Sequence, residues 1–197
     1  MKNTLLSFLV LMSMAVHAQD LGVELAAAAL ERTSHFVWYD GSYQKLAYPN
    51  GDVAKNRGVC TDLVVRAYRN AHGIDLQVHV HEDMQKDFKA YPQQWDLKKP
   101  DASIDHRRTQ NLECFFKRMG AELPITDDPE AYLPGDIVFY GDIGFGHVGI
   151  VSSNRSLFGD IPLVIHNIGM GPREDNFLFD SRITGHYRWN PKDKNAG

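Results

Sequence analysis

Hydrophobic residues recur along the first half of the chain at the spacing of an α-helix. Apolar positions separated by three or four residues form one face of such a helix. This spacing predicts helices over residues 21–32, 61–72 and 110–119, and Gly73 follows the second of them as a C-cap residue. Between residues 77 and 105 the pattern has no clear period.

The second half changes to short apolar runs that are separated by turns. These runs predict strands over residues 137–140, 147–152, 163–167 and 186–189. Helices followed by an antiparallel series of strands indicate an α+β fold, with a sheet of about four to six strands.

Composition limits the class of protein. The chain has 197 residues, 43% of them hydrophobic, which is the size expected for one domain. Its 21 Lys and Arg residues are outnumbered by 25 Asp and Glu residues. This balance provides no basic field that could hold a phosphate backbone, so we expect no nucleic-acid partner.

The first eighteen residues have the features of an export signal. Lys2 supplies the positive charge, residues 5–14 are apolar, and Ala18 ends a small-residue cleavage site before Gln19. The apolar stretch is shorter than the about 20 residues of a transmembrane helix, which favours a cleaved signal over a retained anchor. We therefore expect residues 1–18 to be removed and residues 19–197 to form a single secreted, periplasmic domain without a membrane anchor.

The chain contains two cysteines, Cys60 and Cys114. In an oxidising compartment they could form a disulfide. The local sequence favours another role for Cys60, because it stands at the start of the predicted helix 61–72. The unpaired N–H groups and the dipole at that position favour a thiolate, so we expect a lowered thiol pKa.

Two histidines on predicted strands could supply the base that a nucleophilic thiol needs. His147 begins one strand between Gly146 and Gly149, which leave room beside its ring. His166 lies near the end of the next strand, where it could orient the first imidazole. Cys60, His147 and His166 therefore match the logic of a catalytic triad.

A second group of polar residues lies in the segment without a clear period. His79, His81 and Asp83 alternate, so an extended chain would place them on one face as half of a metal site. Asp105 and His106 could complete that site. A polar loop held by internal hydrogen bonds is the commoner explanation, and we assign no metal and no cofactor.

Several longer motifs resemble known families. Four segments are similar to the NlpC-type branch of the papain-like fold: residues 58–62, 134–138, 147–151 and 164–166. The chain more closely resembles the domain-of-unknown-function 1287 family, from about residue 43 to residue 189, through residues 48–52, 58–68, 80–84, 104–108, 166–169 and 185–188. The resemblance implies a papain-like fold whose nucleophile helix packs on the sheet, and a Cys–His–polar triad of the kind that cleaves cell-wall peptides.

This chain departs from the NlpC pattern beside the nucleophile. Val59 precedes Cys60 where an acidic residue is usual, and Thr61 and Asp62 replace Ser-Gly. No glutamine stands shortly before the cysteine, so the sequence leaves the second oxyanion donor unassigned.

Polar side chains near these motifs are candidates for substrate binding. Arg107 and Arg108 fit carboxylate groups, because a guanidinium fork matches a carboxylate, although ion pairs with Asp101 or Asp105 would also explain them. The positions that we expect to contact substrate are Asp62, Asp83, His106, Arg107, Arg108 and Asn167.

These observations together predict a secreted thiol hydrolase that cleaves an amide bond, in peptidoglycan stem peptides. Two other functions remain open at this stage. One is an inactive papain-like module that binds cell-wall fragments or a protein partner, since a fold alone does not imply chemistry. The other is an acyltransferase or lipid esterase that uses the same triad.

Overall fold

The computed structural model describes residues 21–190, so the predicted signal segment 1–18 lies outside the described residues. A helix over residues 21–31 continues into the 3₁₀ turn η1 (Arg32–Ser34). Helix α2 spans Cys60–His72, α3 Leu76–Lys86 and α4 Thr109–Arg118. Three more 3₁₀ turns follow in the described part: η2 (Phe88–Ala90), η3 (Asp105–Arg107) and η4 (Pro129–Ala131).

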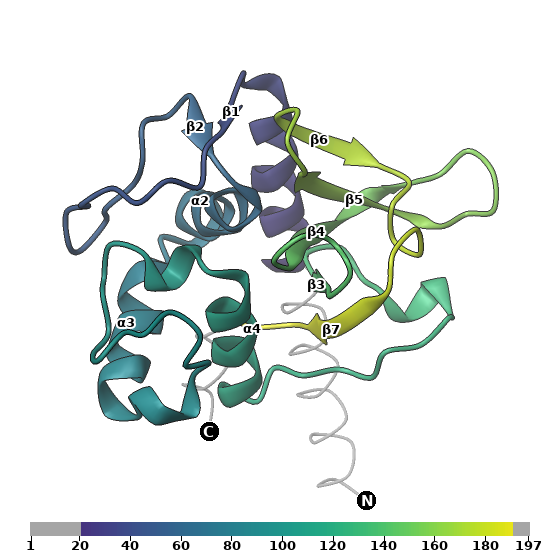
Figure 1. Ribbon diagram of the computed structural model, residues 1–197. Coiled ribbons are helices and arrows are strands. Elements are labelled where there is room, and N and C mark those ends of the chain that lie inside the picture. The colour runs from purple at the N-terminus through teal and green to yellow at the C-terminus, as the bar shows by residue number, and fades with distance from the viewer. Residues whose placement is uncertain (1–20, 191–197) are drawn as a thin grey trace, which may run out of the picture.

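A five-stranded antiparallel sheet forms the second part of the fold (Figure 1). Its strands are β3 (Ile137–Tyr140), β4 (His147–Arg155), β5 (Pro162–Asn167), β6 (Pro172–Asp175) and β7 (Ile183–Tyr187), in the spatial order β6-β5-β4-β3-β7. The two-residue strands β1 (Trp38–Tyr39) and β2 (Arg57–Gly58) pair in parallel beside it. The predicted α+β class is confirmed.

The sheet separates two apolar clusters. The larger one lies between the helices and one sheet face, where Leu63 and Val64 of α2 pack with Val148 and Ile150 of β4. The smaller one lies on the opposite face, around Val138, Tyr140, Val151 and Val164. Because side chains alternate along a strand, β4 contributes Val148 to one cluster and directs the side chain of His147 toward the other face.

The sequence pattern predicted most helices and the longer strands, but it missed the two-residue strands β1 and β2 and two longer elements, α3 and β6. Residues 76–86 form α3, begun by Asp75, whose carboxylate accepts the Gln77 N–H at 3.2 Å. The expectation of an extended segment at His79, His81 and Asp83 is therefore wrong. Strand β6 was also missed, because all four of its side chains are half-buried and none marks an apolar face.

Within residues 21–190, no helix combines the length and the apolar character that a membrane crossing requires.

Candidate active site

Cys60 is the first residue of α2, and the chain around it is shaped for a helix start. Val59 has extended backbone angles, and its N–H donates to the carboxylate of Asp62 at 2.7 Å, as in one half of a capping box. Gly58 has φ +150°, and a Cβ at this position would lie 3.0 Å from Cβ of Asp62. The first turn of the helix leaves backbone N–H groups without helical partners beside the sulfur.

The sulfur lies against the beginning of β4. The backbone of Val148 lies beside Sγ of Cys60, and the Thr109 hydroxyl of α4 is 3.9 Å from that sulfur. His147 precedes Val148 and is among the residues that line the same cavity as Cys60. Within the described residues no hydrogen bond joins Sγ to an imidazole, but the fold brings the predicted nucleophile and base to one cavity.

The two histidines form a chain of hydrogen bonds that ends on a carboxylate. Nε2 of His147 is 2.8 Å from Nδ1 of His166, and Nε2 of His166 is 3.0 Å from Oδ2 of Asp175. An ionised carboxylate can only accept, so Nε2 of His166 carries a proton and its Nδ1 accepts from His147. The Nδ1 lone pair of His147 is then available to take a proton.

Gly149 permits this arrangement of the two rings. It pairs with His166 across the β4–β5 ladder. A Cβ at this position would lie 2.4 Å from Cγ1 of Val164 and 3.3 Å from Cβ of His166. The close packing of His166 against β4 therefore depends on a glycine at position 149.

Burial controls the protonation of the site. The side chains of Cys60 and His147 are 3% and 1% exposed. Burial raises the pKa of the Cys60 thiol, even though the Val148 N–H acts in the opposite direction. Burial, followed by the positive charges of His166 and Arg173, lowers the pKa of His147 to about 3. The expectation of a lowered thiol pKa is therefore wrong, since desolvation outweighs the helix terminus.

Tyr39 of β1 is a site residue that the sequence analysis missed. It lines the cavity, and Cys60 is close enough to act on the titration of its hydroxyl. Burial, followed by the charge of Cys60, raises the pKa of Tyr39 to about 12. A hydroxyl that stays protonated beside the nucleophile can donate to a developing oxyanion.

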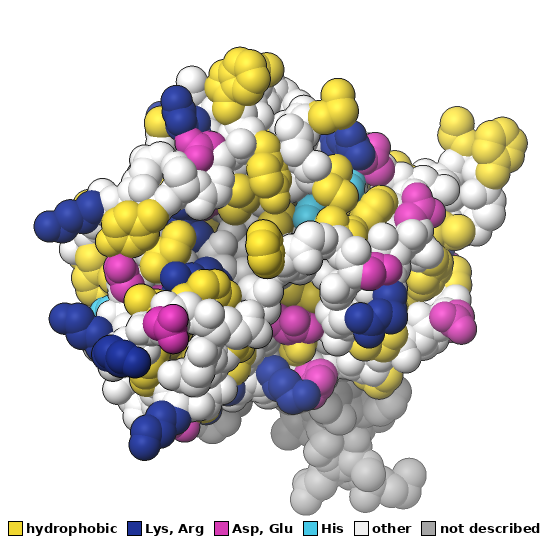
Figure 2. Space-filling model, viewed as in Figure 1, with side chains coloured by type: hydrophobic (Ala, Val, Ile, Leu, Met, Phe, Trp, Pro, Cys, Tyr) yellow, Lys and Arg dark blue, Asp and Glu magenta, His cyan; other side chains and the backbone are white. Residues whose placement is uncertain are grey.

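The cavity in front of Cys60 has a volume of about 700 Å³. Aromatic side chains of Tyr43, Trp95 and Phe145 line it together with backbone of the β3–β4 loop. Figure 2 shows hydrophobic side chains gathered across the middle of one molecular face, over the region between α4 and the strands. The site is thus largely apolar with few polar groups, as is usual for small-ligand sites.

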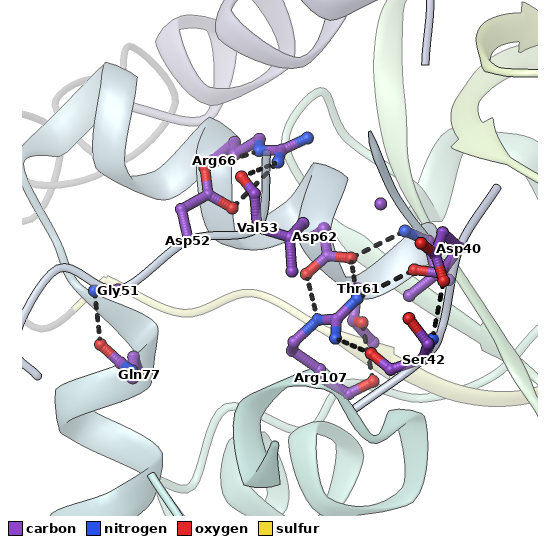
Figure 3. Close-up of polar contacts among 12 residues, drawn as sticks. Asp40, Ser42, Gly51, Asp52, Val53, Thr61, Asp62, Arg66, Gln77 and Arg107 are labelled. Atoms are coloured by element: carbon purple, nitrogen blue, oxygen red, sulfur yellow. Dashed lines mark hydrogen bonds and ion pairs between the residues drawn. The ribbon is translucent and has the colours of Figure 1, made fainter. Parts of the chain in front are cut away.

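Arg107 reaches the cavity, but its guanidinium group is fully engaged (Figure 3). Nε and Nη2 donate to the two carboxylate oxygens of Asp62 at 2.8 and 3.0 Å, and the remaining donors reach the carbonyl oxygens of Asp40 and Ser42. The side chains of Arg107 and Asp62 are 1% and 4% exposed. This buried pair fixes the start of α2 to the segment after β1.

Arg108 also lines the cavity, whereas the remaining positions expected to contact substrate do not: Asp62, Asp83, His106 and Asn167. Asp83 accepts a 2.7 Å hydrogen bond from Tyr91 and pairs with Arg118. His106 is only 2% exposed, and the Asn167 amide reaches the Gly58 carbonyl oxygen at 3.5 Å. These four residues lie in the framework around the cavity.

The alternatives to a catalytic thiol can be compared with the structure. Cys60 and Cys114 are both free, so the disulfide alternative is wrong for this structure. Among residues 21–190, no three His, Cys, Asp or Glu side chains are grouped as a metal site requires.

Asp175 and Thr109, like Tyr39, became recognisable as site residues only through the fold.

Acidification is expected to destabilise the protein through its buried histidines. The folded pKa values of His106 and His147 are about 4 and about 3, whereas an unfolded histidine titrates near pH 6.5. As the pH falls below 6.5 the unfolded state binds more protons than the folded state. Each histidine therefore lowers the free energy of unfolding by about 1.4 kcal/mol per pH unit, down to its folded pKa. Asp105 acts in the opposite direction, since burial raises its pKa to about 6.

The two histidines lower the free energy of unfolding on acidification and Asp105 raises it. The net effect is an expected fall in the free energy of unfolding of about 3 kcal/mol between pH 6.5 and 4.5. Urea unfolding at the two pH values measures this loss. In a His106→Leu variant the free energy of unfolding should change less steeply with pH, because unfolding then takes up about one proton fewer. A free energy of unfolding that stays constant or rises on acidification would contradict the assignment of neutral buried histidines.

Fold and site define an α+β protein in which a cysteine at a helix start lies at one cavity with the first of two strand histidines that are hydrogen-bonded to each other. The model of the family described as "Domain of unknown function (DUF1287)" matches residues 26–189, and the chain belongs to this family. The chain is also 48% identical over 171 residues to "Uncharacterized protein YijF" of Escherichia coli (strain K12), which covers 86% of this chain and 82% of that protein.

Proposed function

We propose that this protein is a papain-like thiol hydrolase of the NlpC type that cleaves an amide bond. The observation that carries the proposal is the arrangement of Cys60, His147 and His166. The first two line one cavity, and the third holds Nε2 of His147 at 2.8 Å. A nucleophile, a base and a group that orients the base are the three components of such catalysis.

The reaction begins from a neutral thiol and a neutral imidazole, because burial disfavours both charged forms. Nδ1 of His147 takes the thiol proton while Sγ of Cys60 attacks the amide carbonyl carbon. The oxyanion accepts hydrogen bonds from the Cys60 N–H and the Tyr39 hydroxyl. His147 then protonates the leaving amine, and a thioester remains on Cys60.

Hydrolysis of the thioester uses the same groups. His147 removes a proton from water, and the resulting hydroxide adds to the thioester carbonyl. Collapse releases the acid and returns a proton to the sulfur. Between these steps His147 is positively charged, and the chain through His166 to Asp175 stabilises that charge and holds the ring.

We place this activity in the periplasm, after removal of residues 1–18, with peptidoglycan stem peptides as the substrate. The predicted export signal supports the location. The aromatic lining of the cavity, with Tyr43, Trp95 and Phe145, supports an organic amide as the ligand.

The test is a digestion of purified muropeptides by the wild-type protein and by Cys60→Ala, followed by mass spectrometry. The wild type should release a new amine and a new carboxylic acid, with a mass gain of one water, and Cys60→Ala should release neither. Equal products from both proteins would contradict the role of the thiol. Intact muropeptides with both proteins would contradict peptidoglycan as the substrate.

Tyr39→Phe tests the second oxyanion donor. Loss of one such donor typically lowers kcat by about 10²–10³-fold, so we expect a loss in this range with little change in KM. Steady-state kinetics on the cleaved muropeptide measure it, and Tyr43→Phe in the same cavity serves as the matched control. Unchanged kcat in Tyr39→Phe would remove this hydroxyl from the mechanism.

A further inference from the structure

The α4 side of the cavity carries a guanidinium group without hydrogen bonds. Arg108 is the N-cap residue of α4, and its side chain is 17% exposed. Within the described residues it makes no hydrogen bond, and its ion pair is a long one: Oδ1 of Asp105 lies 3.6 Å from the buried Nη1. A long ion pair of this kind leaves guanidinium donors without protein acceptors, and a ligand with acceptor oxygens can fill them.

Trp95 holds this guanidinium in place. Cζ of Arg108 lies 4.1 Å from the centroid of the Trp95 ring, as in a cation–π contact. The ring covers one face of the guanidinium plane, so an acceptor approaches along its edge, where the N–H groups point. Both side chains line the cavity that contains Cys60.

The charged side chains of the cavity lining are those of two arginines, Arg107 and Arg108. None of its lining residues is an aspartate or a glutamate. The neighbouring cation, Arg107, is hydrogen-bonded to Asp62, whereas Arg108 has only the 3.6 Å ion pair with Asp105. The helices α2 and α4 also begin at the cavity, with Cys60 and Thr109, and helix N-termini attract anions.

We propose that Arg108, stacked on Trp95, binds a free carboxylate of the substrate close to the amide that Cys60 attacks. The closeness follows from Thr109, which adjoins Arg108 in the chain and whose hydroxyl lies 3.9 Å from Sγ of Cys60. The inference rests on the proposed function for the amide, and it names the substrate class: an acylated amino acid or peptide with a carboxylate next to the scissile bond. One loosely paired arginine fits a monoanionic carboxylate better than a phosphate dianion.

The anion site can be tested without a substrate, by comparing two alkylating reagents. Iodoacetate and iodoacetamide both transfer their CH₂ group to a thiolate and release iodide, but only iodoacetate carries a carboxylate. The ratio of their rates at one cysteine is independent of the thiol pKa, because both reagents need the same thiolate. Cys114, which does not line the cavity, is the internal reference, and peptide mass spectrometry separates the two sites.

We expect the iodoacetate to iodoacetamide rate ratio at Cys60 to exceed that at Cys114 by about tenfold, the size of one charge-assisted hydrogen bond. Arg108→Gln should bring the two ratios together, and Arg108→Lys should retain part of the difference. Lys117→Gln is the matched control, since it removes one exposed positive charge from the same helix. Acetate should protect Cys60 from iodoacetate better than equimolar phosphate.

Equal ratios at the two cysteines, or an unchanged ratio in Arg108→Gln, would overturn the proposal. Stronger protection by phosphate than by acetate would overturn the carboxylate assignment. If neither reagent modifies Cys60, the amide resonances of Thr109 and Gln110 in Cys60→Ala are followed by NMR. Saturable shifts with acetate but not acetamide would support the site, and their absence would overturn it. Failure of the muropeptide digestion leaves these readouts unaffected, so the two proposals fail separately.

Discussion

His147→Ala is expected to lose as much turnover as Cys60→Ala, and the double variant is expected to lose no more. The base and the nucleophile act as one unit, because without the imidazole the buried thiol keeps its proton, and without the thiol the imidazole has nothing to activate. Effects of such residues are strongly non-additive. We expect each single variant to reduce kcat/KM by at least about 10³-fold.

The measurement is kcat/KM on the cleaved muropeptide for both single variants and the double variant. His166→Ala should lose less, about 10–10²-fold, because it holds the base but does not exchange a proton with the substrate. His35→Ala, an exposed histidine of the N-terminal region, is the control and should keep full activity. Losses that add up in the double variant would show that Cys60 and His147 act independently.

Arg107→Met is expected to destabilise the protein by about 3–5 kcal/mol, because it leaves the Asp62 carboxylate buried without a partner. Asp62 is 4% exposed in its side chain and also receives the Val59 N–H, so the unpaired charge would sit at the start of α2. Urea unfolding with an unchanged m-value measures this loss.

Two comparisons separate the effect of the buried charge from a general effect of the substitution. The double variant Asp62→Leu/Arg107→Met removes both charges and should recover much of the loss. Arg57→Met breaks an ion pair with Asp40 in which the arginine side chain is 51% exposed, and it should cost less than about 1 kcal/mol. A loss below about 1 kcal/mol for Arg107→Met would show that the buried pair does not stabilise the fold.

The elements with a strong periodic pattern were predicted well, and those without one were missed. Residues 61–72 were predicted as a helix, and α2 begins one residue earlier, at Cys60. The last predicted strand, 186–189, lies at Ile183–Tyr187, because β7 begins with half-buried residues that give no apolar signal. Helix α3 was missed because its polar and apolar residues do not separate onto clear faces, and contacts with η3 and α4 stabilise it instead.

The residue types of the candidate site were predictable, but their roles depended on distant contacts. The sequence identified Cys60, His147 and His166 from their places at the ends of predicted elements. It could not identify Tyr39 or Asp175, because a tyrosine and an aspartate in short strands give no local sign of the groups that they will meet.

By itself the sequence determined the α+β class, the position of the cysteine at a helix start and the family of the chain, because these depend on periodicity and local motifs. Only the tertiary structure decided which charges are matched and which groups are buried. Arg107 and Arg108 are adjacent residues of one type, yet the first is hydrogen-bonded to Asp62, 45 positions away, whereas the second has a 3.6 Å ion pair with Asp105 and no hydrogen bond at Nη1. Burial likewise reversed the expected thiol pKa, since desolvation depends on the whole fold around a group and not on its neighbours in the chain.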